Sequence, residues 1–293
     1  MSDHIGRQNE ITNEEIDYYS SVASKQGAMV EAGAEPTIIK HLAPAMAASD
    51  EAILSFPEPR DVWIDATYDG AAQYDSYTYI APVAGKRLLQ LGGSGLHAIK
   101  AIRAGAREAW LLTPVLDEAR FAVAVARRLG LHRRLHCVVA VGEELPFARG
   151  SFDAIVSGGC LHHMRTERAI PECARVLSAR GRFAAWDPWR SPFYGIGTRV
   201  FGKREVEVNC QPINAARAQP LQEAFDTATV VHHGALTRYF LIALGKMRIH
   251  LNEPTVSSIT HIDDFVSAWL PGLRRTGSSV ALLGAGPLSQ VPR

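Results

Sequence analysis

The stretch RLLQLGGSGLHAIKAIRAGA, residues 87–106, reads as a buried strand, a glycine turn and a helix that ends at Gly105. Gly92, Gly93 and Gly95 would let a ligand approach the backbone, and the start of the helix offers free N–H groups. The pattern therefore predicts a loop that binds a nucleotide-like cofactor. It is not the dinucleotide fingerprint, because the GxGxxG spacing and an acid about twenty residues later are both missing.

Strands and helices alternate from this stretch to residue 188. Apolar strands are expected at 108–114, 135–142, 151–159 and 182–188, with helices at 116–130 and 167–181 between them. Such alternation is typical of a parallel sheet that is covered on both faces. We therefore predict an α/β fold with a doubly wound, Rossmann-like sheet, which binds its ligands at the carboxyl ends of the strands.

The flanking segments carry further features. Residues 1–80 are expected to form a helical N-terminal cap or lid, with a first helix capped by Asn13, and residues 81–293 form the main domain. Residues 188–222 are irregular and rich in glycine, proline and aromatic residues, which indicates an insertion on the substrate side.

The chain is expected to end in a terminal antiparallel strand pair. The pair is placed at 226–245 with a turn at Gly234, and a helix at 262–275 and a strand at 278–284 follow it.

Composition excludes several classes of protein. The 293-residue chain has a net charge of +1, which gives no electrostatic case for nucleic acid or an anionic membrane. No apolar run approaches the ~20 residues of a membrane span, and the polar, acidic start is unlike a secretion signal or transit peptide. We expect a cytoplasmic protein. The four cysteines and the doublets His162–His163 and His232–His233 fit no metal pattern, so no metal is expected.

Two longer segments carry a resemblance to a known family. VGEELPFARGSFDAIVSGGCLHHM, residues 141–164, and ARVLSARGRFAAWDP, residues 174–188, resemble class I S-adenosylmethionine-dependent methyltransferases, in particular the small-molecule branch with the ubiquinone and sterol methyltransferases. LGGSGLHA and AWLLTP are similar to segments of actinobacterial indole-terpenoid C-methyltransferases of the teleocidin type. The resemblance implies S-adenosyl-L-methionine as cofactor, S-adenosyl-L-homocysteine as product, and no metal.

The chain departs from the family where polar side chains usually contact the cofactor. Gln90 stands in place of the acid before the glycine loop, and Leu112 and Thr113 stand where an acid would bind the ribose. Val141 replaces an aspartate near the adenine, with Glu143 two residues on. The N-terminal tyrosines are candidates to compensate. The predicted cofactor-binding residues are Gly92, Gly93, Gly95, Thr113, Glu143, Glu144, Leu145, Ser157, Tyr18 and Tyr19.

The resemblance places His162 and Asp187 at the carboxyl edge where the methyl group should point, so they are the predicted catalytic residues. A histidine suits proton removal near neutral pH. The structural alternatives are that His162 packs or caps the next helix, and that Asp187 forms a turn before Pro188.

Aromatic residues near the same edge form the predicted substrate pocket. A carbon nucleophile becomes a cation when it takes up a methyl group, and aromatic faces stabilise cations. The predicted pocket residues are Trp186, Trp189, Phe193, Tyr194 and Tyr74.

These features favour C-methylation of a hydrophobic aromatic or prenylated, indole-terpenoid small molecule. O- or N-methylation with His162 as base is the alternative, and the missing acids keep open a non-methylating cyclase or binding protein on the same fold. We also expect a homo-oligomer that exchanges its N-terminal helix.

Overall fold

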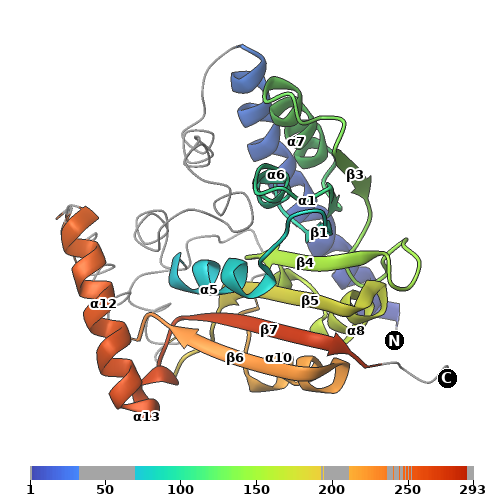
Figure 1. The fold of residues 1–293 in the computed structure, drawn as a ribbon. Helices are drawn as coiled ribbons and strands as arrows, with labels where there is room; N and C mark the ends of the chain where they lie inside the picture. Colours follow the sequence, from blue (N-terminus) through green and yellow to red (C-terminus); the bar gives the residue numbers. More distant parts are fainter. Residues whose placement is uncertain are drawn as a thin grey trace.

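The computed structural model describes residues 2–32, 70–192, 194, 211–235, 240, 244, 247, 249, 251 and 253–288. These residues form a seven-stranded sheet with the order β3-β2-β1-β4-β5-β7-β6 (Figure 1). All neighbouring pairs are parallel except those of β7, which is antiparallel to both β5 and β6. The doubly wound α/β sheet with a terminal antiparallel pair is therefore confirmed.

The strands follow the apolar runs of the sequence. Neither face of β1 is exposed to solvent, because helices cover both sides of the sheet. The leucines at 88, 89 and 91 are therefore buried although successive residues point to opposite faces. The five parallel strands are β1 (Arg87–Leu91), β2 (Glu108–Thr113), β3 (Leu135–Val139), β4 (Phe152–Gly158) and β5 (Leu177–Pro188). The last two strands are β6 (Phe225–His233) and β7 (Ser279–Pro287). Since β5 and β6 both oppose β7, their carboxyl ends meet at the same edge.

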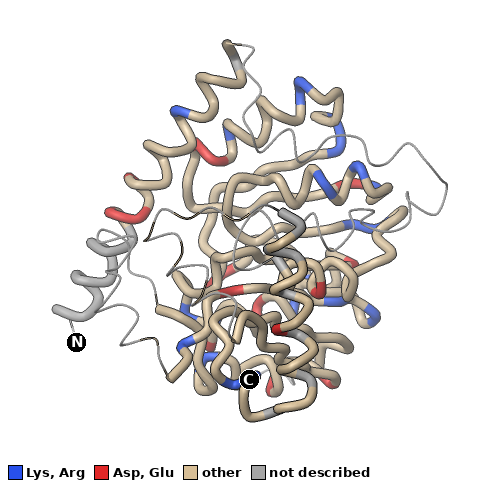
Figure 2. The backbone as a smooth tube through the Cα atoms, turned by 90° about the vertical axis from the view of Figure 1, so that its left-hand side faces the viewer, with Lys and Arg blue, Asp and Glu red and all other residues tan. Residues whose placement is uncertain are grey.

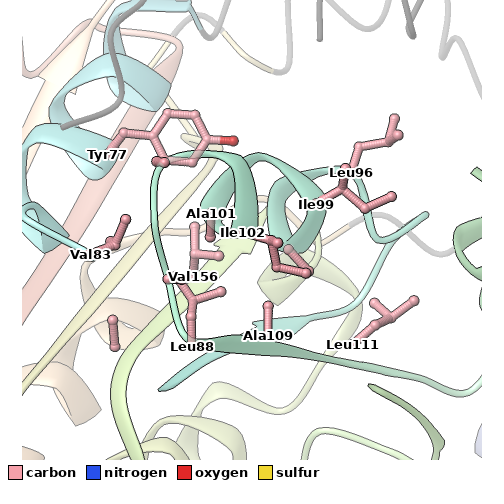
Figure 3. Close-up of a cluster of buried hydrophobic side chains, with 14 of the residues drawn as sticks. Tyr77, Val83, Leu88, Leu96, Ile99, Ala101, Ile102, Ala109, Leu111 and Val156 are labelled. Carbon is pink, nitrogen blue, oxygen red and sulfur yellow. The ribbon is translucent and has the colours of Figure 1, made fainter. Parts of the chain in front are cut away.

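Helices cover the two faces of the sheet and bury a separate apolar cluster on each. The first cluster joins the sheet to α5 (Gly70–Ile80), α6 (Leu96–Arg103) and α7 (Leu116–Arg128). Figure 3 shows part of it, with Tyr77 of α5 beside α6. The second cluster joins the other face to α8 (Thr166–Val176) and α10 (Ala215–Ala224). The 3-10 turn η2 (Leu161–His163) links β4 to α8, while α12 (Glu253–Trp269) and α13 (Pro271–Arg274) precede β7.

The N-terminal helix α1 (Ser2–Glu31) lies along α7 (Figure 1). The Ser20 hydroxyl donates a hydrogen bond to Asp117 of α7, and the Arg128 guanidinium donates to the Val30 carbonyl at 3.3 Å. The predicted start at Asn13 is wrong, because the helix continues through that residue to Ser2. Residues 33–69 of the predicted cap lie outside the described residues.

Two predicted boundaries also differ from the structure. The helix expected to end at Gly181 ends at Val176, and β5 begins directly at Leu177. The register slips there, from Phe152 opposite Leu177 to Ala154 opposite Arg182, so the extra strand residues bulge out of the ladder.

Among the described residues, the antiparallel partner of β6 is β7, which is the strand predicted at 278–284. Most of the second strand of the hairpin predicted at 226–245 lies outside the described part of the chain. In the predicted insertion, an isolated β-bridge joins Trp189 to Ile213. Phe193 and residues 195–210 of the insertion lie outside the described part of the chain.

The described surface has mixed charge. In the view of Figure 2, basic and acidic positions are interspersed along the backbone. None of the described helices has the length and apolar character that a bilayer span requires.

Candidate active site

The glycine loop between β1 and α6 adopts a backbone that only glycine takes easily. Gly92, Gly93 and Gly95 have φ values of 76°, 77° and 80°. A Cβ atom at Gly92 would lie 2.6 Å from Cys160 Sγ, and one at Gly95 would lie 2.5 Å from Ala122 Cβ. At Gly93 the nearest atom would be Gln90 Nε2, at 3.5 Å. Gly92 and Gly95 therefore allow close packing, and Gly93 is the position with room for a ligand.

The Gln90 side chain stabilises the glycine loop through two hydrogen bonds. This side chain is buried, and its Nε2 donates to the Gly92 carbonyl at 2.8 Å. Its Oε1 accepts from the Ala98 amide at 2.8 Å, which satisfies one of the free N–H groups at the start of α6. The residue that stands in place of the family's acid thus joins the loop to the helix through both ends of its amide.

Replacing Gln90 with leucine is expected to destabilise the fold by about 2 kcal/mol, because two hydrogen bonds are lost and the Ala98 amide is left buried without a partner. Urea unfolding of both proteins measures the change. Gln219→Leu is the matched control: its side chain is exposed and donates only to the surface residue Glu223, so its loss should be smaller. Equal stability of Gln90→Leu and the native chain would contradict the role of Gln90.

β2 ends at the same edge, where the Gly92 amide donates to the Leu112 carbonyl at 2.7 Å. Thr113 is buried; its hydroxyl donates to Glu118 Oε2 and accepts from the Val115 amide at 3.1 Å. Glu118 belongs to the first turn of α7 and is 8% exposed, and burial raises the pKa of its carboxyl group.

The loop after β3 uses its predicted cofactor residues for contacts within the protein. Glu143 Oε1 accepts from the Arg165 amide at 3.0 Å, while Glu144 is exposed. The Leu145 side chain is buried in the second cluster, and its amide donates to Glu172 Oε2 at 2.8 Å. These contacts fix the loop beside the site.

β4 ends in a turn against which two rings pack. Trp186 covers Gly158, where a Cβ would lie 2.3 Å from the indole ring, and His162 Cε1 would lie 4.0 Å from a Cβ at Gly159. Ser157 is fully buried, and its Oγ has no hydrogen-bond partner among the described residues. The Cys160 thiol follows; burial and the carboxylates of Asp187 and Glu118 raise its pKa, so it is protonated rather than nucleophilic.

His162 and Asp187 form a buried pair at the ends of β4 and β5. His162 Nδ1 lies 2.7 Å from Asp187 Oδ1, which also accepts from the His162 amide at 3.0 Å. Since a carboxylate only accepts, Nδ1 carries the proton and Nε2 is the basic atom of the ring. Asp187 Oδ2 has no hydrogen-bond partner among the described residues. The two predicted catalytic residues are thus brought together, and Asp187 also caps η2.

An aromatic cluster lies on the opposite face of the same edge. Trp186 packs edge-on to Tyr77 and His97, with ring centroids 5.6 and 4.9 Å away, and the Tyr77 hydroxyl hydrogen-bonds His97 Nδ1 at 2.5 Å. Burial and the nearby Lys100 lower the pKa of His97 to about 3, so its ring is neutral. The sequence indicated Trp186 but not His97, whose signal would have been a polar aromatic residue at the second position of α6.

The remaining predicted pocket residues are dispersed. Trp189 packs edge-on to His232 at 4.4 Å, and Tyr74 packs on the first cluster from α5. The Tyr194 amide donates to the Ser191 carbonyl at 3.0 Å. Phe193 lies outside the described residues.

A second histidine–carboxylate contact at this edge was missed. His233, part of a doublet that fits no metal pattern in the sequence, places Nε2 2.8 Å from Asp75 Oδ2 of α5. Only the β6–β7 pairing shows that this strand ends beside the site.

α1 reaches the site through its tyrosines. Tyr19 donates to His163 Nε2 at 3.3 Å, and His163 Nδ1 donates to Glu15 at 3.2 Å. Tyr18 packs edge-on to Tyr19, with centroids 5.2 Å apart. Both predicted tyrosines therefore lie next to the η2 turn that carries His162.

Comparison with known proteins matches residues 92–185 to the methyltransferase domain family. A tRNA U34 carboxymethyltransferase of Sodalis glossinidius is 40% identical over 90 residues, 30% of this chain and 27% of that protein. The ubiquinone/menaquinone biosynthesis C-methyltransferase UbiE of Sinorhizobium fredii is 37% identical over 94 residues, 31% of this chain and 36% of that protein. The chain thus spans about a third of the length of these relatives.

Solved structures share the fold over a larger part of the chain. A geranyl diphosphate methyltransferase in complex with S-adenosylmethionine has a TM-score of 0.54 at 17% identity, over 81% of this chain and 95% of that chain. The 4+2 cyclase SpnF has a TM-score of 0.53 at 20% identity, over 77% and 85%. At these identities, the likeness shows the fold alone.

The sheet order and glycine loop define a Rossmann-like domain that binds a cofactor at its carboxyl edge. More particularly, residues 92–185 are similar to the methyltransferase domain family, whose cofactor is S-adenosylmethionine.

The site fits that cofactor. Gly93 leaves space at the loop, and the buried oxygens of Thr113, Ser157 and Glu118 lie at or next to the strand ends around it. No group of side chains that could hold a metal ion occurs among the described residues.

Proposed function

We propose that this chain methylates a carbon atom of a hydrophobic small molecule, of the aromatic or prenylated indole-terpenoid kind, with S-adenosylmethionine as donor. The observation that carries the proposal is the turn at Gly158–Gly159, where the Trp186 ring packs on one glycine and the His162 ring on the other. A base and a cation-stabilising aromatic cluster thus flank one point at the carboxyl edge.

The cofactor supplies an activated methyl group when bound. The protein's part begins with Trp186, Tyr77 and neutral His97, whose ring faces and edges offer an apolar environment to an acceptor that becomes positively charged. An acceptor whose π electron pair bonded to that methyl carbon would become a cation, while the carbon–sulfur bond would break and S-adenosylhomocysteine would be the leaving group. His162 Nε2 then takes the proton that the cation loses, and Asp187 stabilises the charged imidazole through Nδ1.

We propose the same roles for the predicted lid, pocket and cofactor-binding residues, at the positions described for the site. We infer that residues 1–80 form the lid, because α1 contacts η2 through Tyr19 and lies along α7. In this structure α1 packs on its own chain. Exchange of α1 within a homo-oligomer, and a cytoplasmic location, stay predictions; the mass in solution of the native chain and of a chain without α1 tests the former.

A small molecule fits better than a nucleic acid, although one curated relative acts on tRNA by its name. The net charge is +1, and in the view of Figure 2 the described Lys and Arg positions are interspersed with Asp and Glu positions along the backbone. Backbone neutralisation by clustered Lys and Arg supplies most of the affinity of nucleic-acid binding proteins.

The reaction is tested by incubating the protein with S-adenosylmethionine and either prenylated indoles or matched phenols. We expect a product that gains one methylene in mass, with the methyl on carbon by NMR, from the prenylated indoles. Methylation on oxygen or nitrogen would overturn the carbon assignment and support His162 as the base of an O- or N-methyltransferase. Absence of S-adenosylhomocysteine binding by calorimetry would overturn methyl transfer altogether and favour a cyclase or binding protein, as in the fold neighbour SpnF.

A further inference from the structure

Glu118 places a carboxylate beside the glycine loop. It is 8% exposed, and its Oε2 accepts from the Thr113 hydroxyl at 2.5 Å. Thr113 ends β2, and the preceding Leu112 carbonyl accepts from the Gly92 amide at 2.7 Å. The carboxylate is also close enough to the Cys160 thiol to raise its pKa, and Cys160 Sγ abuts Gly92. Glu118 therefore lies at the carboxyl edge, one strand from the loop.

The protein compensates the burial of this carboxylate only in part. Among the described residues, no Lys or Arg forms an ion pair with Glu118, and Thr113 supplies its one side-chain hydrogen bond. A carboxylate has about four acceptor sites, and burying it without donors or a cation costs several kcal/mol. The adjacent Asp117 differs, because Ser20 and Arg120 both donate to it.

The position of Glu118 in the fold indicates which kind of ligand could donate hydrogen bonds to its carboxylate. The Ser20 hydroxyl joins α1 to the first turn of α7, and within this turn the Glu118 side chain is buried. At the end of the second strand of such a fold, a carboxylate is suited to a sugar, because vicinal hydroxyls present two donors to its two oxygens. Leu112 and the Thr113 hydroxyl, which is already engaged, cannot accept in this way.

We propose that Glu118, from the first turn of α7, accepts hydrogen bonds from the ribose hydroxyls of the bound cofactor, in place of an acid at the end of β2. The proposal rests on the proposed function for its ligand. It assigns the ribose end of the site to Glu118 rather than to the N-terminal tyrosines. Charge-assisted hydrogen bonds of this kind are about twice as strong as neutral ones.

Calorimetry with S-adenosylhomocysteine and its 2′-deoxy and 3′-deoxy analogues tests this assignment. The native protein is expected to bind the parent compound about tenfold more tightly than either analogue. Glu118→Gln keeps the shape but loses the charge, so the parent should bind about tenfold more weakly and the preference over the analogues should largely disappear. Asp117→Asn is the matched control, one residue away, and should keep the full preference.

The outcomes separate the two proposals. If the native protein does not bind S-adenosylhomocysteine, the proposed function fails. If it binds, and Glu118→Gln keeps the native ratio between parent and deoxy analogues, the role of Glu118 is overturned while the function stands. If circular dichroism shows that Glu118→Gln does not fold, Glu118→Asp replaces it, because aspartate keeps the charge on a shorter side chain. A smaller preference of this variant for S-adenosylhomocysteine over the deoxy analogues supports the assignment, and an unchanged preference contradicts it.

Discussion

Replacing His162 with asparagine is expected to lower the rate of methyl transfer by about 10²–10⁴-fold while the affinity for S-adenosylhomocysteine stays close to native. The proton of the methylated acceptor then has no imidazole nitrogen to accept it. Asparagine can still lie against Gly159, and the Gly92–Gly95 loop is untouched. Single-turnover kinetics with saturating cofactor separates the chemical step from binding.

Asp187→Asn should reduce the rate in the same range, because the amide no longer fixes the Nδ1 proton or stabilises the imidazolium. The matched control is His163→Asn. That histidine is adjacent in sequence but is bonded to Tyr19 and Glu15 of α1, so its loss should leave the chemical step largely intact. A full native rate for His162→Asn would show that the pair only caps and packs η2.

Gly95→Ala is expected to destabilise the protein by about 2–5 kcal/mol. The backbone has φ of 80°, which costs an L residue about 1–2 kcal/mol. In addition, the new Cβ would lie 2.5 Å from Ala122 Cβ and 3.1 Å from Leu111 Cδ2, and overpacking of this kind costs about 1–3 kcal/mol. Urea unfolding measures the loss, which should be accompanied by weaker cofactor binding because α6 must shift from α7.

Gly130→Ala separates backbone strain from packing. Gly130 has a similar φ of 71°, but a Cβ there would meet nothing within 4 Å. It should therefore lose only the strain, about 1–2 kcal/mol. Equal losses for the two variants would mean that α6 and α7 do not pack through Gly95.

The order of elements from β1 to β5 could be predicted because each strand and helix carries its own apolar period. The leucines of β1 and the isoleucines of α6 repeat at the spacing of the element that buries them. Prediction failed where a boundary depends on a partner. The start of β5 at Leu177 follows from its pairing with Phe152, and the strand that pairs with β6 in the described part of the chain is β7, which comes after α12 and α13.

The candidate site was predictable in part for the same reason. His162, Asp187, Trp186 and the glycines stand in motifs with a recognisable spacing, and the structure brings them to one edge. Glu118 and His97 carry no such pattern, because each occupies an ordinary position in a first helical turn. Their chemistry comes from burial: it raises the pKa of Glu118 and holds His97 neutral.

For residues 87–106, the apolar periodicity and the glycines were sufficient to predict a strand, a ligand-binding turn and a helix. Periodicity and turn conformation both depend on residues that are only a few positions apart. The role of Gln90 was not accessible in this way. Gln90 stabilises the loop because the fold places its side-chain amide between the Gly92 carbonyl and the Ala98 amide, away from water. Hydrogen bonding and desolvation depend on which distant groups meet, and the folded chain alone decides that.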